Sequence, residues 1–171
     1  MIIICGLSFA GKTTLGHAIA KRFAYEEVDV DEVKDRLFGA RIKDDALNDE
    51  DWKRLYRETD KQIETLLRAG KTVIDASRNF SKSERASAKQ MAAKANAGLV
   101  TIFVDTPEHV VRRRWLENRR HPTRHDVSDE GFEAIIHAME PPAADEKPLI
   151  FSDGDAINDW IANILTPVLV G

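Results

Sequence analysis

Five short segments of the chain have the hydrophobic pattern of β-strands, and the stretches between them have the pattern of helices. The strand-like segments are 2–5, 27–31, 72–75, 99–104 and 149–151. Residues 2–5 are apolar at every position, which is typical of a buried central strand in a parallel sheet. Strands that alternate with helices predict an α/β domain with a mostly parallel sheet. The sequence shows neither an internal repeat nor a linker, so we expect residues 1–171 to form a single domain.

Helices are predicted where apolar residues recur every three or four positions. They cover about 13–23, 33–37, 49–69, 81–97, 106–118, 128–139 and 155–165. Several ends carry the expected signals, because Gly70 lies where a C-cap belongs and Ser81 and Glu84 have capping-box spacing. Thr106 and Pro107 predict an N-cap followed by a first-turn proline.

The loop after the first strand carries the strongest motif. Residues 6–13 read G-L-S-F-A-G-K-T, which fits the phosphate-binding pattern G-x-x-x-x-G-K-S/T between a buried strand and an amphipathic helix. Glycines let the backbone curl so that successive N–H groups point into one concavity, at the positive end of the helix. Lys12 then supplies a full positive charge to the β- and γ-phosphates, and Thr13 supplies a hydroxyl for Mg²⁺. The alternative is a chance glycine turn, which the strand–loop–helix context disfavours.

ATP and Mg²⁺ are therefore the expected ligands, with contacts from this loop and from an arginine-rich segment at 112–125. The loop contacts are Gly6, Ser8, Ala10, Gly11, Lys12, Thr13 and Thr14. Phosphoryl transfer needs cations around the transferred group, so we expect a lid at 118–129 in which Arg119 and Arg124, and then Arg120, contact ATP. Residues 112–114 point about 100° apart on a helix, so these three arginines cannot all face one ligand. The alternative is a solvated run of charges.

Two aspartates follow predicted strands and are the candidate acidic groups. Asp31 ends the second strand, where it can accept the proton of a hydroxyl that attacks the γ-phosphorus. The alternative role for Asp31 is the N-cap of the following helix. Asp29 points to the same side in a regular strand. Asp75 ends the third strand in the position that holds Mg²⁺ directly or through water, unless it caps a turn.

Composition narrows the classes of function. Hydrophobic residues make up 43% and charged residues 32% of the chain, which is ordinary for a globular protein, and the net charge is -4. An acidic chain is not a general polyanion binder, so nucleic-acid recognition would need a local basic patch. The single cysteine, Cys5, excludes an internal disulfide. Since neither a signal peptide nor a membrane-length apolar stretch is visible, we expect a cytoplasmic protein.

The chain resembles the P-loop kinase group that includes phage-type polynucleotide 5′-kinases, zeta-toxin kinases and small AAA-type kinases. The first feature that carries the resemblance is the loop at 6–13. The second is the segment 28–34, which is similar to the family's D-x-x-R motif. The third is the segment 72–77 with Arg85 downstream, which is similar to the family's V-I-D-x-T-N…R motif. The fourth feature is the Thr106-Pro107 helix that runs into the arginine-rich segment. This family implies a three-layer fold with a five-stranded parallel sheet in the order 2-3-1-4-5.

The resemblance also implies roles for individual residues. Asp31 would be the general base, and Asp75 and Arg85 would lie at the acceptor. The chain departs from the family where an arginine is usual three residues after the catalytic aspartate, because Lys34 stands there. Lys34 is therefore expected at the substrate, and Arg36 is the alternative replacement for the family arginine.

These features predict an ATP-dependent kinase that phosphorylates a hydroxyl group. The acceptor classes left open are a polynucleotide 5′ end, a nucleotide-sugar, and a small metabolite or antibiotic. The alternative is a non-kinase NTPase or a nucleotide-gated regulatory module, in which Asp31 would be a cap and the arginines would meet a partner. GTPases are disfavoured because the sequence lacks their N/T-K-x-D motif.

Overall fold

The computed structural model describes residues 1–40, 42–122 and 127–170. Within these residues five strands form a parallel sheet: β1 (Ile2–Cys5), β2 (Glu26–Val28), β3 (Val73–Asp75), β4 (Val100–Asp105) and β5 (Leu149–Ser152). Their order is β2-β3-β1-β4-β5, which confirms the predicted topology. None of the helices in the described ranges is long and apolar enough to cross a membrane.

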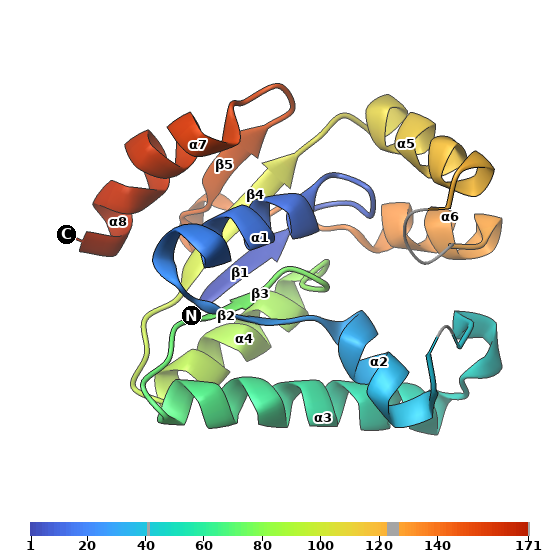
Figure 1. Ribbon diagram of the computed structural model, residues 1–171, viewed down its shortest axis with the longest axis horizontal. Coiled ribbons are helices and arrows are strands. Elements are labelled where there is room, and N and C mark those ends of the chain that lie inside the picture. Colours follow the sequence, from blue (N-terminus) through green and yellow to red (C-terminus); the bar gives the residue numbers. More distant parts are fainter. Residues whose placement is uncertain (41, 123–126, 171) are drawn as a thin grey trace.

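Helices cover both faces of the sheet (Figure 1). In chain order they are α1 (Lys12–Phe23), α2 (Val30–Phe38), α3 (Asp49–Arg68), α4 (Lys82–Lys94), α5 (Glu108–Arg120), α6 (Asp129–Ala138), α7 (Ile157–Trp160), the π-helical segment η3 (Ile161–Leu165) and α8 (Thr166–Val170). Two short 3₁₀ turns, η1 (Asp44–Ala46) and η2 (Ala144–Glu146), lie in connections. Figure 1 shows α1, α7 and α8 on one side of the sheet and α3 and α4 on the other, so the molecule is a three-layer sandwich.

The central strand β1 separates two apolar cores. Ile2 and Ile4 pack with residues of α1, α5, α6 and α7, whereas Ile3 packs with residues of α2, α3 and α4. All three isoleucines are at most 1% exposed. Because successive strand side chains point to opposite faces, a strand covered on both sides is apolar at every position. This explains the uninterrupted apolar run at the start of the sequence.

The second strand is shorter than its alternating pattern predicts. It ends at Val28, and Asp29 becomes the N-cap of α2, with its carboxylate accepting a hydrogen bond from the Asp31 backbone N–H at 2.8 Å. Asp31 therefore lies in the first turn of α2 and not at the end of a strand, and the capping role falls to Asp29 rather than Asp31. A carboxylate at an N-cap stabilises a helix start by satisfying an otherwise unpaired donor, which ends the strand here.

Two other element ends differ from the prediction. Pro107, and not Thr106, occupies the N-cap position of α5. The C-terminal helix, predicted to end at 165, continues to Val170 through a π-helical turn. Pro167 has no backbone N–H to continue regular helical pairing, and the Thr166 hydroxyl donates to the Ile161 carbonyl at 2.8 Å within this widened turn.

Candidate active site

The carboxyl ends of β2, β3 and β1 bring three predicted site segments to one edge of the sheet. Asp75 on β3 pairs in register with Val28 on one side and with Ile3 on the other. Asp29 and the loop that starts at Gly6 therefore follow directly at the same edge. In open α/β sheets this edge is where ligands bind.

The loop at 6–13 has the curled backbone that its glycines predict. Gly6 has φ 142° and Gly11 has φ 110°, and Phe9 adopts a left-handed conformation with φ 64°. Lys12 is 7% exposed, and its ammonium donates to the carbonyls of Gly6 and Leu7, both at 2.9 Å. The lysine charge thus lies over the loop itself, beside the N-terminus of α1. Among the described residues no side chain caps that N-terminus at Gly11, which leaves its first N–H groups to face an anion.

Two residues outside the motif hold the loop in this shape. The Thr106 hydroxyl donates to the Ala10 carbonyl at 3.0 Å, and the Arg114 guanidinium donates to the same carbonyl at 3.1 Å and to the Phe9 carbonyl at 3.4 Å. Arg114 also pairs with Asp153 at 2.7 Å. Neither role follows from the sequence, because both contacts join segments about a hundred residues apart. The phosphate loop is therefore held by the β4–α5 connection through Thr106 and by α5 through Arg114.

A Gly6→Ala substitution should destabilise the protein and weaken nucleotide binding. A Cβ built at Gly6 lies 2.7 Å from the Val104 carbonyl oxygen, and φ is in a region that side chains avoid. The expected loss of folding free energy is about 1–3 kcal/mol, measured by denaturant unfolding. Gly98→Ala is the matched control, since a Cβ there meets no atom within 4 Å. Equal stability of the two variants would contradict the close packing of the loop on β4.

A cavity of about 820 Å³ lies between the phosphate loop, α5 and the loop after β5. Its lining includes Gly11 and Thr14 from the start of α1, Arg114 and Arg120 from α5, and Gly154 from the far side. This volume lies in the range of sites for small molecules and cofactors. A nucleotide whose phosphates rest on the loop could place its nucleoside here.

The arginines of the predicted lid divide into different roles. Arg120 lines the cavity. Arg119, the first choice from sequence, instead pairs with Asp129, donates to the Val127 carbonyl at 3.2 Å and lies over the Trp115 ring. Arg124 lies outside the described residues. Arg112 pairs with Glu108 on α5 and with Glu133 on α6, which agrees with the expectation that the three adjacent arginines do not all face one ligand.

Asp75 is fully buried and bound on both carboxylate oxygens. One oxygen accepts from Arg78 Nε at 2.9 Å and Asn79 Nδ2 at 3.2 Å, and the other accepts from the Ser77 N–H at 3.3 Å and hydroxyl at 3.4 Å. Arg78 also pairs with Asp60 on α3 at 2.6 Å. Direct ligation of Mg²⁺ by Asp75 would break part of this set, so contact through water fits better. The sequence did not predict the contacts of Arg78 and Asn79 with Asp75.

Asp31 is paired with Lys34, which stands three residues further along α2. Lys34 is 2% exposed, with its ammonium 3.2 Å from Asp31 Oδ1 and 2.8 Å from Asp44 Oδ1. Burial lowers the pKa of Lys34, but the hydrogen bond with Asp44 and the charge of Asp31 outweigh it, so the pKa is raised and the side chain stays charged. Arg36 turns away and donates to Gln62 on α3 at 2.9 Å.

A match over most of the sequence identifies the family. The pattern of the family described as AAA domain fits residues 1–142. The chain belongs to this AAA domain family. None of the curated proteins matches the sequence significantly.

Solved structures share the fold of this AAA domain. A sugar kinase from Janibacter sp. HTCC2649 superposes with a TM-score of 0.68 at 18% identity, over 99% of this chain and 94% of that one. The APS kinase CysC of Mycobacterium tuberculosis, in complex with AMPPNP and APS, superposes with a TM-score of 0.69 at 17% identity, over 98% of this chain and 96% of that one. Kti12 of Chaetomium thermophilum, in complex with ADP-AlF3, gives 0.68 at 18% identity over 99% of each chain. The chain therefore has the fold of small P-loop kinases, and this fold does not choose an acceptor.

Arg85 of the AAA domain does not join the cavity beside the phosphate loop. The sequence predicts it among the substrate-binding residues, whereas the structure directs its guanidinium to both oxygens of Glu146, at 2.7 Å and 3.0 Å. This hydrogen-bonded pairing lowers the pKa of Glu146. Arg85 is 2% exposed, so its charge is committed to this pair.

Metal binding in this AAA domain can be judged from the available donors. The described residues contain no group of three His, Cys, Asp or Glu side chains that could hold a metal ion by themselves. Mg²⁺ differs from other protein-bound metals because it usually keeps several waters and takes one or two protein oxygens plus substrate phosphates. The Thr13 hydroxyl on the phosphate loop and the Asp75 carboxylate at the same sheet edge form a donor set of that kind.

Proposed function

We propose that this AAA domain is an ATP-dependent phosphotransferase that moves the γ-phosphate of ATP onto a hydroxyl group. The observation that carries the proposal is the braced phosphate loop, with Lys12 folded over it, a nucleotide-sized cavity on one side and acidic groups at the same sheet edge on the other. A loop built only as a turn would need neither a buried lysine charge nor an uncapped helix N-terminus.

In this proposal the nucleotide is held by main-chain and cationic groups. The amides of residues 8–13 and the N-terminus of α1 would bind the phosphates, and Lys12 would exchange its two carbonyl contacts for β- and γ-phosphate oxygens. Arg114 and Arg120 would reach the phosphates from α5, since both line the cavity. Thr13 and, through water, Asp75 would hold Mg²⁺, which neutralises phosphate charge when bound.

Asp31 would act as the general base at the acceptor. Its side chain is 42% exposed, and its carboxylate can receive the proton of an incoming hydroxyl. Lys34 holds this carboxylate in place, and Asp44 balances the lysine charge from its other side. In this arrangement Lys34 fixes the position of the Asp31 carboxylate, and the carboxylate stays accessible to an acceptor.

The charges on the acceptor side favour a small, uncharged or amine-bearing acceptor over a polynucleotide end. Lys34 lies between Asp31 and Asp44, and Arg78 lies between Asp75 and Asp60. Each cation is therefore matched by two carboxylates, which repel rather than attract a polyanion. Phosphate recognition would require these pairs to break.

A non-kinase NTPase is the second candidate. The observation that favours it is the commitment of Arg119 to Asp129, because an arginine predicted to contact ATP instead ties α5 to the start of α6. In that case Asp31 would only stabilise the start of α2, and turnover would end in hydrolysis.

An acceptor panel with γ-labelled ATP separates these candidates. We expect transfer of label to neutral sugars, polyols or amino-sugars above the rate of transfer to water. Sugar phosphates and 5′-hydroxyl oligonucleotides in the same panel test the charge argument. Hydrolysis without transfer to any acceptor would favour the NTPase, and label on an oligonucleotide would refute the preference for a small acceptor.

A further inference from the structure

The connection between β3 and α4, residues 76–81, contacts both Asp75 and Lys12 of the candidate site. Its Asn79 has φ 74° and donates its side-chain amide to Asp75 at 3.2 Å. Its Phe80 ring lies under the ammonium of Lys12, with 5.0 Å from Nζ to the ring centroid. The path of this connection therefore affects the positions of the lysine and the aspartate together.

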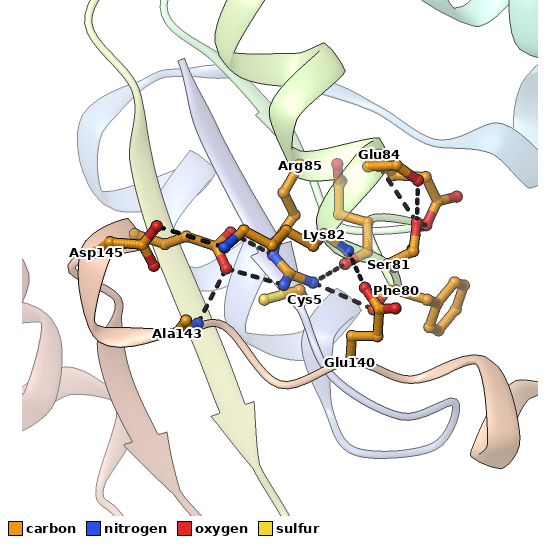
Figure 2. A network of polar contacts seen from close by, with 12 residues as sticks. Cys5, Phe80, Ser81, Lys82, Glu84, Arg85, Glu140, Ala143 and Asp145 are labelled. Atoms are coloured by element: carbon orange, nitrogen blue, oxygen red, sulfur yellow. Dashed lines mark hydrogen bonds and ion pairs between the residues drawn. The ribbon is translucent and has the colours of Figure 1, made fainter.

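Arg85, in the first turn of α4, is hydrogen-bonded to this connection (Figure 2). Its Nη1 donates to the carbonyls of Asn79 at 3.3 Å and Phe80 at 3.1 Å. Its Nε and Nη2 donate to the two oxygens of Glu146 in a bidentate pair. Glu146 accepts a further hydrogen bond from the Ala143 N–H at 2.9 Å, which fixes the carboxylate in turn.

The segment that follows α6 closes the same network. Glu140 donates its backbone N–H to the Phe80 carbonyl at 2.9 Å, and its carboxylate accepts from the Lys82 N–H at 2.6 Å. Figure 2 shows Glu140 and Ala143 on the strand of chain that passes beside Phe80 and Arg85. The Phe80 carbonyl thus accepts one hydrogen bond from Arg85 on α4 and one from Glu140, which follows α6.

We propose that Arg85 and Glu146 are positioning residues for phosphoryl transfer: they set residues 76–81 so that Phe80 and Asn79 hold Lys12 and Asp75, and they join this connection to the segment after α6. The proposal rests on the proposed kinase function. An apolar pair of similar volume would stabilise a fold as well as a buried ion pair does. An apolar pair could not, however, donate hydrogen bonds to the two adjacent carbonyls of Asn79 and Phe80, as the Arg85 guanidinium does.

Glu146→Gln tests the proposal because it removes the charge but keeps the side-chain length. We expect kcat for phosphate transfer to fall about ten- to a hundredfold while the Kd for ATP changes less than about threefold, since small displacements of catalytic groups cost rate more than binding. Amide hydrogen exchange of residues 76–81 should become faster. Glu146→Asp, which keeps the charge, should recover part of kcat.

Two further variants keep the test decisive. Phe80→Leu removes the ring under Lys12 without touching the ion pair, and its effect on kcat should not add to that of Glu146→Gln. If Glu146→Gln does not fold, Arg85→Lys replaces it, because it keeps the charge but loses the directed donors to the Asn79 and Phe80 carbonyls, and a normal kcat in that variant would overturn the positioning role. Arg68→Gln is the control, because it breaks an exposed pair with Glu64 on α3.

Outcomes separate this inference from the proposed function. Normal kcat with unchanged exchange at residues 76–81 in Glu146→Gln overturns the positioning role and leaves the kinase proposal standing. A wild-type protein that neither binds ATP nor turns it over removes the kinase proposal, whatever the variants do. A fall in the melting temperature with proportional loss of ATP binding and of kcat would show a role in stability alone.

Discussion

Replacement of Lys12 by alanine is expected to lower the rate of phosphate transfer at least about a thousandfold. The ammonium is buried against the loop, where two carbonyls and the Phe80 ring hold it. In a site shielded from water, a full charge aimed at the transferred group stabilises the transition state far more than it would in solution. The measurement is single-turnover transfer from γ-labelled ATP, with ATP affinity measured separately by calorimetry.

Lys21→Ala on the same helix is the matched control for Lys12→Ala. Lys21 is exposed in the last turn of α1, so its removal should change neither transfer nor affinity. Circular dichroism of the Lys12 variant should match the wild type, because the Leu7 carbonyl keeps its hydrogen bond from the Ala10 N–H at 3.2 Å. A Lys12→Ala protein with normal turnover would refute the assignment of residues 6–13 as the phosphate site.

The Asp31→Asn variant should lose about a hundred- to ten-thousandfold in kcat and little in ATP affinity. Asparagine keeps the shape of the side chain but cannot accept the proton of an attacking hydroxyl. The fold should tolerate the change because Asp44 still pairs with Lys34 at 2.8 Å and Asp29 still caps α2. The measurement is a comparison of kcat with the Kd for ATP in the presence of the best acceptor found in the panel.

Glu32→Gln supplies the control for Asp31→Asn, since Glu32 is an exposed neighbour in the same helical turn. It should retain normal kcat. If Asp31→Asn also retained normal kcat, Asp31 would be a helix-start residue only, and Asp29 would be the next carboxylate to test. A matching loss of ATP affinity in Asp31→Asn would show that the aspartate acts on the nucleotide rather than on the acceptor.

Local sequence patterns were sufficient to predict the alternating strands and helices and the phosphate loop, whereas the strand order came from the resemblance to P-loop kinases. The apolar run at 2–5 predicted a central strand, and the structure buries it on both faces. The capping box of Ser81 and Glu84 starts α4 as predicted. Each of these signals acts between residues at most four positions apart, which is why they can be read without coordinates.

The start of α2 shows where local patterns compete. Residues 27–31 alternate as a strand would, but two aspartates in the segment could each cap a helix. The strand pairs with β3 only as far as Val28, and the Ser77 hydroxyl accepts the Val30 N–H at 3.0 Å. A neighbouring strand and a distant serine therefore decided that Asp29 caps the helix and Asp31 lies inside it.

The sequence by itself determined the order of strands and helices, the phosphate loop and the place of Asp75 at a strand end. Tertiary structure alone decided the partners: Arg114 and Thr106 brace the loop, Lys34 joins Asp31 to Asp44, and Arg85 turns to Glu146. The reason is that helix periodicity, caps and turns depend on near neighbours, whereas a charged side chain takes whichever partner packing brings within about 3 Å. For Arg85 that partner lies 61 residues away, and no local pattern encodes it.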